Sequence, residues 1–133
     1  MLFRSEAMAR PHIGTAEPYP VQIESKDGAQ VLSWLPLWRA LLDDLRQGRE
    51  AGGIAATVHL ALAAALADLV VDLAEQGAPD RAILSGGVMQ NRILLEALHE
   101  RLTQRGLNVL AHHRAPANDG GLALGQATIA AGA

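Results

Sequence analysis

The spacing of apolar and polar residues predicts a β-hairpin near the beginning of the chain. Residues 19–24 alternate between apolar and polar side chains, which is the pattern of a half-buried strand. Lys26-Asp27-Gly28 then supplies turn-forming residues, so residues 30–33 are expected to return as the second arm. Residues 1–18 contain prolines and a glycine but no sustained period. We expect an irregular lead-in there, followed by one domain over residues 19–133.

Two helices should follow the hairpin. For the first, Ser33 is the expected N-cap, Pro36 lies in the first turn and Gly48 ends the helix. Its apolar stripe consists of Leu37, Trp38, Leu41, Leu42 and Leu45. The second helix runs from about Ile54 to Gln76 and is so rich in alanine that it should pack closely on a sheet or another helix.

The second helix approaches the length of a membrane span, but its composition favours a buried central helix. It contains Thr57, His59 and Asp68, and an aspartate inside a span costs about 2.5–3.5 kcal/mol even on a lenient insertion scale. We therefore predict no membrane segment.

The last third of the chain has the most regular pattern. Strands are predicted at Arg81–Leu84 and Asn108–Ala111, and helices at about Asn91–Arg105 and Leu122–Ala131. This βαβα order predicts two parallel neighbouring strands joined by a right-handed crossover. The fold class is therefore α/β, with an N-terminal β-hairpin, two helices and a βαβα unit.

Two glycine-containing loops follow the two strands, where ligands bind in such sheets. In the first loop, Gly86 and Gly87 either cradle a phosphate at the start of the next helix or simply make a tight turn; spacing alone does not decide. Asn91 is better explained as a helix N-cap than as a ligand-facing amide.

In the second loop, Asp119 is followed by Gly120 and Gly121. Its carboxylate could cap the last helix, contact a ribose or a phosphate-bound cation, or bind a metal. Capping has the most weight from the residues alone, although a plain cap does not need two glycines after it.

Charge and composition exclude several classes of function. A formal charge of −3 and a pI near 5.9 provide no basic surface for nucleic acid. The absence of cysteine excludes disulfides and thiolate chemistry, and no signal peptide is recognisable, so we predict a cytoplasmic protein. His112 and His113 are interpreted as a solvated strand end, and His59 as a satisfied core histidine.

Both loops resemble those of a known family. Leu84-Ser85-Gly86-Gly87-Val88-Met89-Gln90-Asn91-Arg92 and Pro116-Ala117-Asn118-Asp119-Gly120-Gly121 resemble the carboxyl-terminal part of HypF-type carbamoyltransferases of nickel-iron hydrogenase maturation. The family is related to the tRNA threonylcarbamoyl transferases. The resemblance covers residues 17–131.

The resemblance implies one lobe of an actin/sugar-kinase/Hsp70-like (ASKHA) fold that binds ATP or carbamoyl-adenylate. By this resemblance the nucleotide-binding residues are Ser85, Gly86, Gly87, Asn91, Gly120 and Gly121. Asp119 would be a ligand of a divalent metal, iron or zinc, and this replaces the capping role favoured above. The implied partners are a first lobe, which this sequence does not contain, and a hydrogenase maturation protein bearing the acceptor cysteine.

Two functional hypotheses follow. In the first, the chain is part of a carbamoyltransferase that moves a carbamoyl group from carbamoyl-adenylate to a cysteine thiolate, and is incomplete alone. In the second, it is a non-catalytic remnant or an interaction module that dimerises through the face a first lobe would cover.

Overall fold

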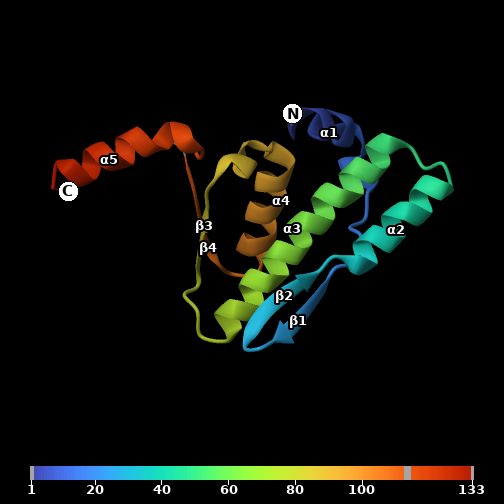
Figure 1. Cartoon of the computed structure of the whole chain (residues 1–133), viewed down its shortest axis with the longest axis horizontal. Helices are drawn as coiled ribbons and strands as arrows, with labels where there is room; N and C mark the ends of the chain where they lie inside the picture. Colours follow the sequence, from blue (N-terminus) through green and yellow to red (C-terminus); the bar gives the residue numbers. More distant parts are fainter. Residues whose placement is uncertain (1, 113–114, 133) are drawn as a thin grey trace.

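A computed structural model describes residues 2–112 and 115–132 of the chain as an α/β arrangement (Figure 1). In chain order the elements are α1 (Leu2–Ala9), the 3₁₀ helix η1 (Arg10–Thr15), β1 (Gln22–Lys26), β2 (Ala29–Ser33), α2 (Leu35–Arg46), α3 (Ala51–Glu75), β3 (Arg81–Leu84), the 3₁₀ helix η2 (Gly87–Gln90), α4 (Arg92–Gln104), β4 (Asn108–Ala111), the 3₁₀ helix η3 (Asp119–Gly121) and α5 (Leu122–Ala130). The predicted order of hairpin, two helices and βαβα unit is confirmed, with α1 and η1 added in front.

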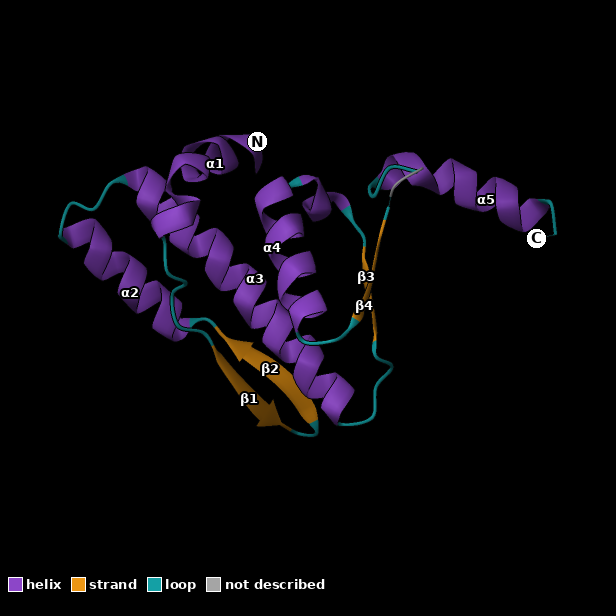
Figure 2. Cartoon of the chain, turned by 180° about the vertical axis from the view of Figure 1, so that it is seen from behind, coloured by secondary structure: helices purple, strands orange, loops and turns teal. Residues whose placement is uncertain are grey.

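The long helix α3 occupies the centre of the molecule. It packs against α4 and, next to α4, against α1 and η1, while α2 and the hairpin lie on the side opposite α4 (Figures 1 and 2). Its buried positions are mostly small, namely Gly52, Gly53, Ile54, Ala56, Thr57, His59, Ala61, Ala63, Ala65 and Ala67. Because alanine places little side chain between backbones, the neighbouring helices can approach closely, as the composition predicted.

Helix α3 passes the length and composition test for a membrane span, and no other helix of residues 2–112 and 115–132 does. However, half of its most apolar window is buried inside the protein. Asp68 on α3 also pairs with Arg105, with 3.3 Å between Oδ1 and Nη2. These contacts agree with the predicted buried central helix.

The βαβ unit packs on α3. Strands β3 and β4 are parallel and pair Arg81 with Asn108 through to Leu84 with Ala111, so both strand predictions are confirmed. Helix α4 connects them and covers one face. The core here is built from Ala63, Ala67, Ala82, Leu84, Leu94, Leu98, Leu102 and Leu107.

The hairpin forms with the predicted turn. Lys26 pairs with Ala29 across a two-residue loop, and Asp27 and Gly28 have φ of 53° and 79°. Two residues with positive φ define the type I′ turn that matches the twist of a hairpin. The first strand begins at Gln22, later than predicted, and the hairpin forms a two-stranded sheet separate from β3–β4.

Two predictions about the first half of the chain are wrong. The lead-in is not irregular, because α1 and η1 pack on α3 and bury Glu6 and Ala9. Helix α2 is capped by Trp34 without a side-chain hydrogen bond, so Ser33, the last residue of β2, is not its cap. Pro36 does lie in the first turn.

A polar network ties the segment before the hairpin to both middle helices. The Tyr19 hydroxyl donates to Oδ2 of Asp44 at 2.5 Å, and Arg49 donates to the same oxygen. Arg49 also donates to Oγ1 of Thr57 at 3.0 Å. Burial, and then the hydrogen bond to Asp44, raise the pKa of Tyr19 to about 12. The same bond, followed by that from Arg49, lowers the pKa of Asp44.

Large apolar side chains are in contact with solvent on α2, where Leu35, Trp38, Leu42 and Leu45 are 46–55% exposed, and at the end of the molecule formed by β3, β4 and α5. On the sheet face turned away from α4, Ile83 is 68% exposed and Leu110 is 43% exposed. Helix α5 extends away from the rest of the chain, beyond the ends of β3 and β4 (Figure 2). Every residue of α5 is exposed, and Ile129 reaches 79%.

We expect substitutions in the two regions to have very different effects on stability. Leu102→Ala removes a side chain with no exposed surface and should lower the free energy of unfolding by about 2–5 kcal/mol. Leu124→Ala on α5 is the matched control and should change it by less than about 0.5 kcal/mol. Urea denaturation measures both, and equal losses would contradict the exposed position of α5.

The single tyrosine allows a direct test of the polar network. Because the neutral phenol is favoured in the folded state, the tyrosinate absorbance band should appear with a midpoint near pH 12, above the usual 10.0. The stability contributed by Tyr19 should be complete below pH 10 and be lost as the pH rises through 12. Tyr19→Phe should remove this dependence, whereas a native-state midpoint near 10 would show that the network is absent.

Candidate functional site

The two glycine-containing loops lie side by side. They follow paired strands, and the register that places Leu84 beside Ala111 also brings Ser85 beside His112, with 2.9 Å between Oγ and Nε2. The backbone N–H of Gly86 donates to the carbonyl of Ala117 at 2.8 Å. The loops are therefore joined through both a side-chain pair and a backbone hydrogen bond.

A cleft of about 450 Å³ lies at these loops. Its lining consists of Ser85, Gly86, His112, Ala115, Pro116, Ala117, Asn118, Asp119, Gly121, Leu122, Gly125, Gln126 and Ile129. The cleft thus runs from the carboxyl ends of the strands onto one side of α5. It brings together four of the predicted site residues, Ser85, Gly86, Asp119 and Gly121.

Glycine is required at two positions beside the cleft. Gly86 has φ of 97°, a left-handed conformation that other residues rarely adopt. A Cβ on Gly121 would lie 2.7 Å from the carbonyl oxygen of Pro116, closer than such atoms can approach. The packing of the second loop against itself therefore requires glycine at position 121.

The structure corrects the cap of the second loop. Asn118 is the N-cap residue of η3, and its Oδ1 accepts from the N–H of Gly120 at 3.0 Å. The last helix, α5, has Gly121 as its N-cap and no side-chain cap, so the capping role first given to Asp119 is wrong. Asp119 is exposed, and its carboxylate forms no hydrogen bond or ion pair with the residues that the structure describes.

Asn91 is a buried helix cap and does not line this cleft. It is 3% exposed, and its Oδ1 accepts from the N–H of Leu94 at 3.1 Å. Its Nδ2 lies 2.8 Å from Nε2 of His59. Asn91, the predicted cap, and His59, the predicted satisfied histidine, therefore form a hydrogen bond with each other.

Two N–H groups at the start of α4 already have acceptors within the chain. Oδ1 of Asn91 accepts a hydrogen bond from the N–H of Leu94, and the buried Glu6 carboxylate accepts from the N–H of Arg92 at 3.3 Å. Glu6 thereby places a negative charge where a helix N-terminus favours an anion. Among described residues, the N–H groups of Gly87 and Val88 at the start of η2 have no acceptor.

The donors present do not by themselves fit a metal. No group of three or more His, Cys, Asp or Glu residues with metal-binding geometry occurs among residues 2–112 and 115–132. Asp119 is a single carboxylate, and His112 Nε2 is within hydrogen-bond distance of Ser85. His113 lies outside the described residues. Zinc sites need three or four protein ligands, so the described residues supply too few.

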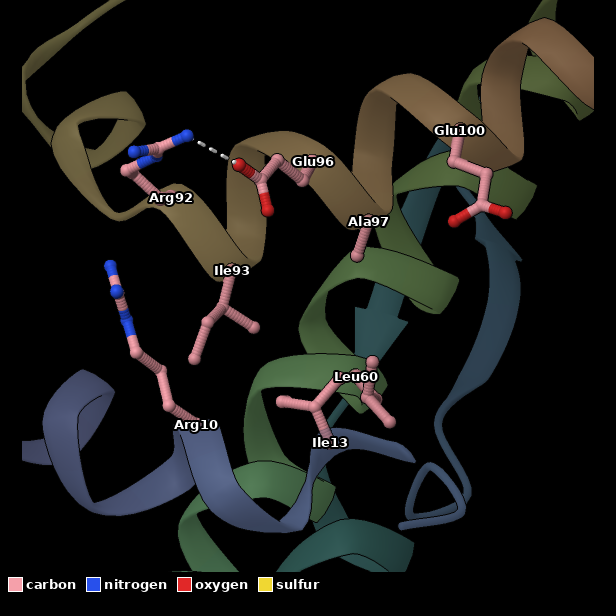
Figure 3. A pocket seen from close by; sticks show the side chains of 8 residues that line it. All are labelled: Arg10, Ile13, Leu60, Arg92, Ile93, Glu96, Ala97 and Glu100. Carbon is pink, nitrogen blue, oxygen red and sulfur yellow. Dashed lines mark hydrogen bonds and ion pairs between the residues drawn. The ribbon is translucent and has the colours of Figure 1, made fainter. Parts of the chain in front are cut away.

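A cavity of about 530 Å³ lies on another face, between η1, α3 and α4 (Figure 3). Its two arginines are paired within the chain, and Glu100 accepts a hydrogen bond from Gln104 at 3.1 Å. Arg92 binds Glu96 and Arg10 binds Glu6, each with 3.0 Å between nitrogen and oxygen. Ile13, Leu60 and Ile93 form an apolar floor. No glycine is among the described residues that line this cavity, unlike the cleft at the two loops.

Sequence reasoning missed two parts of the site. The Ser85–His112 contact follows from the parallel register, because each residue comes directly after a paired strand. Glu6 had no comparable signal, because its role depends on tertiary packing between α1 and α4.

Comparisons with known proteins agree with the loop motifs. The family model for "Carbamoyltransferase, Kae1-like Domain, second subdomain" matches residues 3–126. Carbamoyltransferase HypF of Rhizobium leguminosarum bv. viciae is 41% identical over 104 residues, which cover 77% of this chain and 13% of that protein. Carbamoyltransferase HypF of Synechocystis sp. is 30% identical over 121 residues, covering 91% and 15%.

Solved structures give the same result. The crystal structure of full-length HypF in its phosphate- and nucleotide-bound form matches with a TM-score of 0.83 and 32% identity, covering 95% of this chain and 16% of that one. HypF of T. kodakarensis matches with a TM-score of 0.73 and 25% identity over the same shares. This chain therefore spans less than a fifth of the length of these relatives. It belongs to the HypF carbamoyltransferase family, within which it matches the second subdomain of the Kae1-like domain.

Proposed function

We propose that the chain forms one wall of a nucleotide-dependent carbamoyl-transfer site. The observation that carries this proposal is the pair of loops joined by the Gly86–Ala117 hydrogen bond at the carboxyl ends of β3 and β4. The N–H groups of Gly87 and Val88 would meet the phosphate of ATP or carbamoyl-adenylate. Ser85, Gly120 and Gly121 would shape the surrounding wall, and Asn91 would contribute from behind as the cap of α4.

The reaction would transfer a carbamoyl group from carbamoyl-adenylate to a cysteine of a hydrogenase maturation protein. The cysteine thiolate would attack the carbamoyl carbon, and the bond from that carbon to the phosphate oxygen would break and release AMP. This chain has no cysteine, so the acceptor belongs to a partner.

A first subdomain is the second proposed partner, and it would complete an ASKHA-type cleft. The exposed apolar side chains on one face of β3–β4 and on α5 support this contact with a first subdomain. An isolated helix shorter than about 12–15 residues is marginal in water, and a helix that is apolar all round is normally buried. Helix α5 has nine residues and only Gln126 and Thr128 are polar, so it fits a position covered by another part of the protein.

For the divalent metal, Asp119 would provide one oxygen ligand and the first subdomain would provide the others. The isolated chain is accordingly expected to bind neither metal nor nucleotide tightly. A cytoplasmic location remains a prediction.

A second candidate function, a dimerising interaction module without catalysis, rests on the same exposed side chains. Ile83, Leu110 and Ile129 could be covered by a second copy of the chain. Sedimentation equilibrium distinguishes the cases: self-association that Ile83→Asp abolishes supports dimerisation, and a monomer across the accessible concentration range removes it.

The main proposal is tested by reconstitution. The chain is mixed with a HypF-type carbamoyltransferase from which the corresponding subdomain has been deleted, and ATP binding is measured by calorimetry. We expect binding by the mixture and none by this chain alone. Carbamoyl transfer to an acceptor cysteine is measured on the same mixture. A mixture that forms a complex but shows neither activity would contradict the proposal.

Gly121→Ala is the informative variant in that mixture. The added Cβ would displace the Pro116 carbonyl and with it the second loop, so we expect at least a tenfold loss of ATP affinity, about 1.4 kcal/mol. Gly14→Ala is the control, because nothing lies within 4 Å of its Cβ and it is distant from the loops. Equal affinities of the two variants would show that the second loop does not form part of the site.

A further inference from the structure

A buried line of hydrogen bonds connects α3 to the end of the first glycine loop. His59 Nδ1 lies 2.7 Å from the carbonyl oxygen of Ala55, and His59 Nε2 lies 2.8 Å from Nδ2 of Asn91. Asn91 Oδ1 in turn accepts from the N–H of Leu94. His59 and Asn91 are 6% and 3% exposed.

The direction of every hydrogen bond in this line is fixed by its two ends. The Ala55 carbonyl can only accept, so Nδ1 of His59 must carry the proton. The Leu94 N–H can only donate, so the oxygen of Asn91 must face it and the amide nitrogen must face His59. Nε2 of a neutral His59 is then the acceptor that Asn91 requires. Turning the amide over would set Asn91 NH₂ against the N–H of Leu94 in a buried site.

This line ends where the glycine loop ends. Asn91 follows η2 directly, and its own N–H donates to the carbonyl of Val88 at 3.0 Å, while the N–H of Met89 donates to Gly86. At its other end the loop is held by Leu84 in the core. The backbone from Gly86 to Val88 thus lies between two fixed points, Leu84 in the core and Asn91 at the start of α4.

We propose that His59 is a positioning residue that acts through Asn91 to hold the Gly86–Val88 backbone in one conformation. The functional meaning of that conformation rests on the proposed function, in which this backbone meets the nucleotide phosphate. His59 touches no part of the cleft at the loops, so it acts at a distance from the reacting groups.

A simple space-filling role for His59 makes a different prediction. The other core-facing positions on the same turns of α3 are mostly alanine or other apolar residues, and burying a polar side chain is costly unless it is hydrogen-bonded. If packing were the only role, an apolar side chain of similar size would serve as well. If positioning is the role, an acceptor at the place of Nε2 is required.

The test uses NMR on the isolated chain with His59→Leu, His59→Gln and Asn91→Ser. In the wild type we expect the His59 ring nitrogens to show the tautomer protonated at Nδ1. His59→Leu should speed amide exchange of Leu94 about tenfold, as expected for a lost buried hydrogen bond, and should shift the resonances of Gly86, Gly87 and Val88. His59→Gln restores an acceptor through its Oε1 and should return both toward wild type.

Asn91→Ser keeps a capping oxygen but removes the amide that reaches His59. It should therefore preserve the protection of Leu94 and still shift the loop resonances, and it keeps the test decisive if His59→Leu does not fold. Loop resonances unchanged in Asn91→Ser, failure of His59→Gln to rescue, or an Nε2-protonated wild-type ring would each overturn the proposal.

A second arm measures ATP affinity of the same variants in the reconstituted mixture. We expect His59→Leu and Asn91→Ser to bind at least fivefold more weakly and His59→Gln to lie near wild type. If the wild-type mixture binds no ATP, the proposed function fails, while the NMR results still decide whether His59 positions the loop.

Discussion

The close approach of other elements to α3 is the constraint on which the rest of the structure depends. Ala56, Ala61 and Ala63 have no exposed surface, and a Cβ on Gly52 would lie 2.8 Å from the Met8 carbonyl. Larger side chains at Gly52, Ala56 and Ala63 would separate α1 and α4 from α3, and a larger one at Ala61 would displace the cluster of Tyr19 and Leu37. Because β3 and β4 pack on the same core, their carboxyl ends, and therefore both loops, take their places from this packing.

The molecule is consequently well packed around α3, whereas large apolar side chains meet solvent on β3, β4 and α5 and also on α2. The core between α3, α4 and the sheet contains four leucines of 8% exposure or less from α4 and the segment after it. On the opposite face of the same two strands, Ile83 and Leu110 meet solvent, and α5 carries its leucines and isoleucine into solvent. The exposed face of β3, β4 and α5 supports the proposed contact with a first subdomain.

The sequence predicted local features well and tertiary roles less well. Strands β3 and β4 were predicted to the residue, because their limits follow from short apolar runs between turn-forming residues, and Asn91 has the usual properties of a cap. The lead-in is not predicted because α1 has no strong period, and its Glu6 is buried only in the folded chain, where α1 packs on α3 and Glu6 contacts Arg92 of α4. Because this contact depends on tertiary packing, the sequence alone does not show that Glu6 accepts a hydrogen bond from the N–H of Arg92 at the start of α4. The cap at Asn118 was overlooked because the neighbouring Asp119 is equally suited by residue type.

The central claim is that the core of this subdomain is complete while the face bearing α5 requires the rest of the protein. Hydrogen-deuterium exchange of the isolated chain and of the same segment within a complete HypF-type protein tests this most directly. The account predicts equal protection of α3 and α4 in both, with fast exchange of α5 in the isolated chain and strong protection of α5 in the complete protein. Equal protection of α5 in both states would contradict it.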